Sequence, residues 1–295
     1  MKIKPKLSER IFDLINVVVM LVVAAVTLVP FLNVIAKAFS SGGAVSSGRV
    51  SIIPIGFQLD TMKFVLQEPQ FKSSMVISLT VTLIGTIGAM ILTILTAYPL
   101  SKLHFRGRKV FLYIFIFTML FQGGIVPNFL LYKSLGLTNT INALIFSGMF
   151  SVYNMLIMKT FFEGLPETIE EAAKIDGASN LKILFKIVLP ISKPVLATIG
   201  LFYAVNYWNN YFNAVLYITK PELKPLQQYL YELVTSATNI LDSAGGVKDI
   251  EVASNLSGET IRSATILAST LPILCLYPWL QKYFQKGMTI GSVKG

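Results

Sequence analysis

Residues 73–100 read SSMVISLTVTLIGTIGAMILTILTAYPL and contain no Asp, Glu, Lys or Arg. A helix needs about 20 mostly apolar residues to cross the roughly 30 Å hydrocarbon core of a bilayer. Because lipid offers no hydrogen bonds to the backbone, a spanning segment of this kind pairs its own backbone groups as a helix. The stretch therefore predicts a transmembrane helix.

Five further runs lack all four charged residue types and have similar lengths: 14–36, 110–132, 135–158, 194–219 and 263–281. The chain is 54% hydrophobic and 14% charged, with a mean hydropathy of +0.65. Soluble domains carry about 25% charged residues. The sequence thus predicts an all-α integral membrane protein with six transmembrane helices, forming a single transmembrane domain over residues 1–295.

The positive charges predict how the helices are oriented. Of the 25 Lys and Arg residues, 16 lie in the N-terminal tail, in residues 101–109, in residues 159–193 and in the C-terminal tail, 282–295. Lys and Arg are enriched in cytoplasmic loops of membrane proteins. Both termini are therefore expected to be cytoplasmic, with the first apolar run retained as a helix. The net charge of +10 is explained by this pattern and by lipid headgroups, and we predict no nucleic-acid binding.

The residue types that carry most metal and nucleophilic chemistry are scarce. The chain has one cysteine, Cys275, and one histidine, His104. An internal disulfide is impossible, and no metal-ligand or nucleophile cluster is evident. We predict that the chain has no catalytic residue, binds no metal or other cofactor, and is not itself an enzyme.

One charged segment differs from the other loops. Residues 165–190 read LPETIEEAAKIDGASNLKILFKIVLP. Pro166 suits the first turn of a helix, and the glutamates that follow it complement the positive end of the helix dipole. Gly177 interrupts this helix, and Ser179 or Asn180 can cap a second one. We predict a cytoplasmic helix-turn-helix over 163–190 whose first helix docks on another protein.

The same segment contains a spaced motif. Glu171-Ala172-Ala173 is followed after three residues by Gly177, after nine more by Ile187, and after one more by Leu189-Pro190. This pattern resembles the EAA loop of bacterial ABC importer permeases. The runs 123–127, 135–140, 189–194 and 283–295 are similar to maltose-type carbohydrate permeases, and most similar to their complex-oligosaccharide branch.

The resemblance implies a bacterial cytoplasmic-membrane permease that moves a sugar or oligosaccharide inward. It implies three kinds of partner: an ABC ATPase dimer that holds ATP and Mg, a second homologous permease subunit in a heterodimer, and an extracellular or periplasmic sugar-binding protein. By this analogy the residues that couple transport to the ATPase are Glu170, Glu171, Ala172, Ala173, Ile175, Asp176, Gly177, Ile187, Leu189 and Pro190. The tail residues Gly291, Ser292 and Val293 are expected to reach the ATPase interface.

The fifth apolar run carries candidate sugar-pathway residues. Asn206, Asn209, Asn210 and Asn213 recur at helical spacing and are expected to share one helix face. Amides can bind sugar hydroxyls, and the aromatic faces of Tyr207 and Trp208 can pack on the apolar surface of a sugar ring. Amide bonds between helices and an aromatic belt at the membrane interface remain alternative explanations.

Two other functions fit parts of the sequence. A solitary secondary transporter normally carries an ionisable group inside a span, and none occurs in the six runs. An importer for peptides or amino acids would share the docking loop, so only the resemblance to carbohydrate permeases argues against it.

Overall fold

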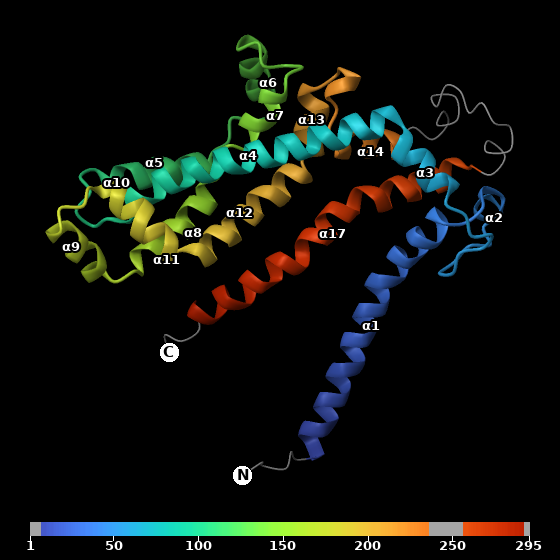
Figure 1. Ribbon diagram of the computed structural model, residues 1–295, viewed down its shortest axis with the longest axis horizontal. Coiled ribbons are helices and arrows are strands. Elements are labelled where there is room, and N and C mark those ends of the chain that lie inside the picture. The colour runs from blue at the N-terminus through green and yellow to red at the C-terminus, as the bar shows by residue number, and fades with distance from the viewer. Residues whose placement is uncertain (1–6, 236–255, 292–295) are drawn as a thin grey trace. The chain divides into compact units, whose positions relative to one another are not determined.

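The computed structural model describes residues 7–235 and 256–291, and every regular element in them is helical, as predicted (Figure 1). The chain divides into two compact units. The first is built from Met1–Glu68 and Glu232–Leu271, and the second from Pro69–Tyr231 and Pro272–Gly295. The candidate docking segment lies wholly within the second unit.

The first unit contains a long helix with an unusually exposed apolar surface. Helix α1, Leu7–Ala38, is followed by the short helices α2, Gly42–Ser46, and α3, Asp60–Gln67. The membrane-length part of α1 is not buried by the rest of the chain, and only its end packs, through Ala36, against α2. Such a surface suits lipid or another membrane helix.

The last helix, α17, runs Gly258–Gly291. Near its start, Glu259 accepts a 2.5 Å salt bridge from Lys37 at the end of α1. Arg262, one turn further along, donates from Nε to the carbonyl of Leu233 at 3.1 Å. The salt bridge joins the two sequence segments of this unit, and the Arg262 bond lies within the second segment.

The core of the second unit is the contact of α4, Pro69–Ser101, with α12, Lys193–Trp208, and α8, Val152–Glu163. Figure 1 shows α12 and α8 alongside α4, and α9 and α10 at the end of α4 that leads to α5. Small residues let membrane helices approach closely, and α4 buries a row of them that are four or seven positions apart and so share one face of the helix. These residues are Ser74, Ser78, Gly85, Ala89, Thr93 and Ala97.

Two tyrosines of α12 fill the space that these small residues leave. The hydroxyl of Tyr203 lies 2.7 Å from Thr93 Oγ1 and accepts a 3.0 Å bond from the backbone N–H of Ser151. Tyr207 donates a 2.7 Å hydrogen bond to the carbonyl of Ile145. An added Cβ at Gly85 would lie 2.5 Å from the Tyr207 ring. The ring therefore needs a glycine beneath it.

Three runs expected to be unbroken helices are broken in the structure. The run 110–132 forms α5, Arg108–Leu120, and α6, Ile125–Ser134, at 109° to each other, with Gly124 at φ +87° between them. The run 135–158 forms α7, Ile141–Ser147, and α8, at 51°. The run 194–219 breaks after α12 and resumes as α13, Tyr211–Tyr217. The runs 14–36 and 73–100 are each one helix, as expected.

The remaining elements are shorter. Between α8 and α12 lie α9, Glu167–Ile175; α10, Asn180–Ile183; a π-helical turn, η1, Leu184–Val188; and α11, Leu189–Ile191. After α13 come a 3-10 turn, η2, Pro221–Leu223, and α14, Leu226–Thr235.

By length and composition, two helices among the described residues can cross a membrane by themselves, and up to five spans exist if each bent pair counts as one. The two are Ser8–Ala38 and Pro69–Ser101. Six crossings remain a prediction, and so does the single-domain organisation of residues 1–295.

The packing of Tyr207 gives a test of this fold. We expect Gly85→Val to destabilise the protein by about 1–3 kcal/mol, because the added methyl groups collide with a ring that is held by its hydroxyl bond. Thermal unfolding of the full chain in detergent measures the effect. Gly200→Ala on α12 is the matched control, since its Cβ would meet only Met90 Sδ at 3.9 Å. Equal stability of both variants and the parent chain contradicts the packing described.

Candidate functional site

The site is built on α9, whose ends follow from its sequence. Pro166 stands at the N-cap position, and Glu167 and Glu170 occupy the first turn, where acidic side chains complement the helix dipole. At the other end, the N–H groups of Gly177 and Ala178 bond to the carbonyls of Lys174 and Ala173, both at 3.0 Å. These two bonds form a Schellman turn, whose left-handed residue is Gly177 at φ +76°.

The second half of the segment turns into α12. Ser179 caps α10 by accepting from the N–H of Lys182 at 3.4 Å, as one of two predicted caps. The π-helical turn that follows includes Ile187, and Leu189 and Pro190 form α11. The segment Asn180–Ile191 meets α12 at 86°. The predicted helix-turn-helix is therefore present and continues into a core helix.

Helix α9 has two different faces. Glu170 and Ala173 are buried, and Ala173 belongs to the hydrophobic core of the second unit. Glu171 and Ala172 are exposed, and the side chain of Ile175 is 87% exposed. Asp176 and Gly177 at the end of the helix are also exposed. The predicted coupling residues of α9 therefore fall into two sets. Glu170 and Ala173 face inward, and the other residues face outward.

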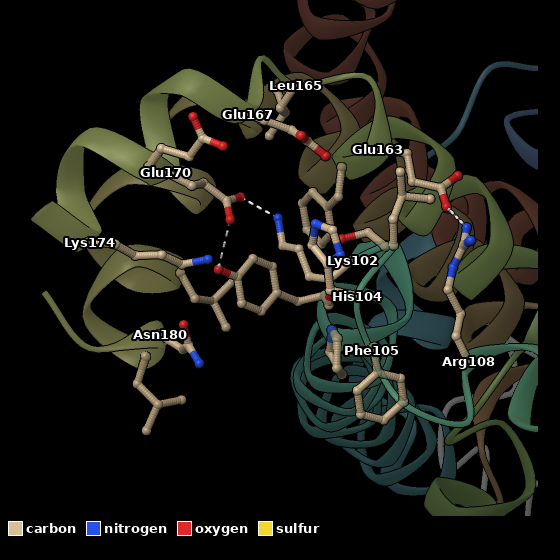
Figure 2. A pocket seen from close by; sticks show the side chains of 18 of the residues that line it. Lys102, His104, Phe105, Arg108, Glu163, Leu165, Glu167, Glu170, Lys174 and Asn180 are labelled. Carbon is tan, nitrogen blue, oxygen red and sulfur yellow. Dashed lines mark hydrogen bonds and ion pairs between the residues drawn. The ribbon is translucent and has the colours of Figure 1, made fainter.

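The inward face borders a cavity of about 670 Å³. Its walls are the end of α4, the loop to α5, the end of α8, and the helices α9 and α10. Figure 2 shows Glu170 and Lys174 on one side of this cavity and Lys102 and His104 on the other. The cavity thus separates α9 from the ends of the core helices, and charged side chains reach into it from both sides.

Glu170 bridges the cavity. One carboxylate oxygen, Oε1, accepts a salt bridge from Lys102 Nζ, and the other, Oε2, accepts a 3.4 Å bond from the hydroxyl of Tyr98 (Figure 2). The Lys102 ammonium also lies 4.7 Å from the centre of the Tyr98 ring, within the range of a cation–π contact. Both oxygens of the buried carboxylate are therefore bound by the end of α4.

A second ionic group closes the opposite wall. Glu163, the last residue of α8, pairs with Arg108 at the start of α5 and with Lys159 one turn earlier, at 2.8 Å for the latter. Arg108 Nε also donates to the carbonyl of Leu100 at 2.9 Å. This group joins the ends of α4, α5 and α8. Charge-assisted bonds therefore hold together the helix ends that form the cavity wall opposite α9.

Sequence reasoning missed Tyr98, Lys102 and Glu163. Lys102 was interpreted only as one of the basic residues that set topology. The sequence did contain a signal for the pairing, because the basic loop 101–109 and the acidic helix after Pro166 both adjoin predicted crossings on the same side of the membrane. No spacing rule, however, shows which basic residue pairs with which acidic one. Among the described residues, no group of three or more His, Cys, Asp or Glu side chains is placed to hold a metal ion.

The candidate sugar-pathway residues differ from the prediction. A single face for the four asparagines was wrong, because the helix ends at Trp208 and Asn210 caps the next helix by accepting from the N–H of Asn213 at 3.3 Å. Asn206 and Asn209 are exposed, whereas Tyr207 and Trp208 are buried within the chain. Of the predicted pathway residues, Asn206 and Asn209 are therefore the exposed ones.

The C-terminal residues predicted to reach the ATPase are only partly described. Gly291 is the last residue of α17. Ser292 and Val293 lie outside the described residues.

Comparison with known proteins covers nearly the whole chain. The family model described as "Binding-protein-dependent transport system inner membrane component" matches residues 89–290. Protein LplC of Bacillus subtilis is 43% identical over 288 residues, which cover 98% of this chain and 96% of LplC. The polygalacturonan/rhamnogalacturonan transport system permease protein YtcP of the same species is 40% identical over 289 residues, covering 98% and 100%.

A solved structure agrees with these matches. A chain in the crystal structure of a bacterial ABC transporter involved in import of the acidic polysaccharide alginate superposes with a TM-score of 0.90 at 34% identity. The match covers 96% of this chain and 100% of that one. The resemblance to ABC carbohydrate permeases seen in the sequence is confirmed: this chain belongs to the family of inner membrane components of binding-protein-dependent transport systems.

Proposed function

We propose that the chain is the permease subunit of an ATP-driven importer that moves an oligosaccharide into the cytoplasm. The observation that carries the proposal is the match over nearly the full length of both chains to a subunit of the alginate transporter. The partners that follow are a pair of ATPase subunits, a second permease and an external sugar-binding protein. The chain supplies the passage, and ATP is bound and hydrolysed in the separate subunits.

In this proposal the chain crosses the membrane six times, with both termini and the segment 163–190 in the cytoplasm. The outward face of α9 supports this arrangement. An isoleucine side chain that is 87% exposed at the tip of a short helix is a suitable anchor for a groove on a partner protein. The adjacent Glu171 and Ala172 provide a charge and room for close approach. The end of α17 around Gly291 is proposed to lie at the same interface.

Acidic oligosaccharides are the substrates to test first. The transporter names of two similar proteins refer to polygalacturonan and alginate. The rings of Tyr132 and Tyr217 stack with their centroids 4.4 Å apart. An exposed lysine lies close to each in sequence, Lys133 directly after Tyr132 and Lys220 three positions after Tyr217. In the proposed topology these lysines lie at the external end, where positive charge attracts a polyanion.

The docking surface predicts the effect of two substitutions. Ile175→Asp and Glu171→Lys should each reduce co-purification of the ATPase and sugar uptake by about tenfold or more, because an anchor and a charge at the interface are lost. The measurement is ATPase yield on the tagged permease, with uptake in proteoliposomes. Ile53→Asp is the control, because Ile53 is 76% exposed but lies outside this segment. Normal ATPase yield from both α9 variants contradicts the proposal.

The turn after α9 gives a separate prediction. Gly177→Val should lower uptake while leaving membrane insertion intact, because a β-branched residue at φ +76° strains the turn by about 1–2 kcal/mol. Gly177→Asn should retain most of the uptake, since Asn adopts positive φ more easily. Membrane abundance and uptake are measured together. If valine and asparagine behave alike, the left-handed turn is not what matters at this position.

The exposed asparagines give a third prediction. If Asn206 and Asn209 line the sugar route, alanine at both should reduce uptake of an oligogalacturonate several-fold without changing ATPase stimulation, since hydrogen bonds to the passing sugar are lost. Asn139→Ala is a contrasting variant. Its Oδ1 accepts from the N–H groups of Thr219 and Lys220 at 2.7 and 3.1 Å, so its loss should lower stability. Unchanged uptake after the double substitution argues against the route.

A further inference from the structure

The two adjacent glutamates of α9 have different surroundings. Successive residues of a helix point about 100° apart, and here Glu170 is 8% exposed and bound to α4, whereas Glu171 faces outward. We propose that Glu170 is a positioning residue: with Lys102 and Tyr98 it forms a strut that transmits movement of the docking helix to α4. The inference rests on the proposed function, because it assumes that α9 receives movement from the ATPase.

The strut is an internal contact with every acceptor atom in use. Glu170 Oε1 is bound by Lys102 and Oε2 by Tyr98. The carboxylate side chain is 11% exposed and the lysine side chain 32%, so solvent screens the pair less than it would a surface pair. Removing one partner of a largely buried pair leaves an uncompensated charge. A group held in this way is a poor candidate for direct contact with the ATPase.

Among the described residues, this is the only salt bridge made by α9. Helix α9 is also held by the packing of Ala173 in the core and by the chain, which enters it from α8 and leaves it through the Gly177 turn, α10 and α11 to α12. Since α12 packs along α4, the strut and the chain connect α9 to the same pair of core helices. With the strut intact, a push on α9 displaces both helices. Without it, α9 keeps only the packing of Ala173 and its chain connections, and a push on it is passed to α4 less completely.

The experiment uses the assembled transporter in proteoliposomes and compares the parent permease with three test variants and one control. Glu170→Gln and Lys102→Met each break the strut, and the double variant Glu170→Lys with Lys102→Glu restores it with the charges exchanged. The control exchanges Asp60 and Lys63, an exposed pair whose charged atoms lie 4.0 Å apart. For each permease we measure the bound ATPase, the rate of ATP hydrolysis and sugar uptake.

We expect the single variants to bind the normal amount of ATPase but to hydrolyse at least about fivefold more ATP per sugar taken up, within the usual range of coupling between sites. The exchanged pair should recover most of the ratio, and the control should keep it. A residue needed only for folding would change protein yield and leave this ratio unaltered.

Three results would overturn the strut. They are a normal ratio in both single variants, a failure of the exchanged pair to improve on them, and a loss of ATPase binding in Glu170→Gln that the exchange does not restore. The last result would place Glu170 in direct contact with the ATPase. If the parent chain itself binds no ATPase, the proposed function fails as well, so the two failures are distinguishable.

Discussion

The close approach of α4 to α12 and α8 is the contact on which the other parts of this structure depend. Lipid is as apolar as a leucine side chain, so membrane helices gain little from burying apolar surface and associate through close packing and hydrogen bonds. The small residues of α4 permit that packing. Tyr203 adds a hydroxyl bond to Thr93 of α4, and Tyr207, packed over Gly85, bonds to Ile145 of α7. The ends of the same helices form the walls of the cavity beneath α9.

This arrangement gives the docking segment a rigid base and an open outer surface. Two ionic groups, around Glu163 and Glu170, hold the ends of α4, α5, α8 and α9 together. The outer face carries no such group in the described part of the chain, and its most exposed apolar side chain is Ile175. In the proposed function the permease performs no covalent step, and its coupling residues act by transmitting movement. We infer that the outward residues of α9 receive movement from the ATPase and that the inward residues pass it on to α4.

The sequence predicted well what depends on local composition. Uncharged runs located the two helices long enough to cross a membrane, Leu7–Ala38 and Pro69–Ser101, and the residue types around Pro166, Gly177 and Ser179 located the start of α9, the turn after it and the start of α10. Hydropathy could not locate the bend between α5 and α6, because glycine and apolar residues are equally compatible with lipid on either side of it. The break at Asn209 and Asn210 was missed because an N-cap and a polar helix face have the same composition. The different surroundings of Glu170 and Glu171 depend on Lys102, 68 positions earlier, which no local pattern reveals.

The central claim is that α9 lies on the cytoplasmic side and receives movement from the ATPase. Side-specific labelling tests this claim most directly. Cys275 is the only cysteine, so Cys275→Ser with Ile175→Cys leaves one thiol at the tip of α9. A membrane-impermeant maleimide should label this thiol in inside-out vesicles stripped of ATPase and leave it unlabelled in right-side-out vesicles, and added ATPase should protect it. Labelling from the outside, or labelling unaffected by ATPase, contradicts the account.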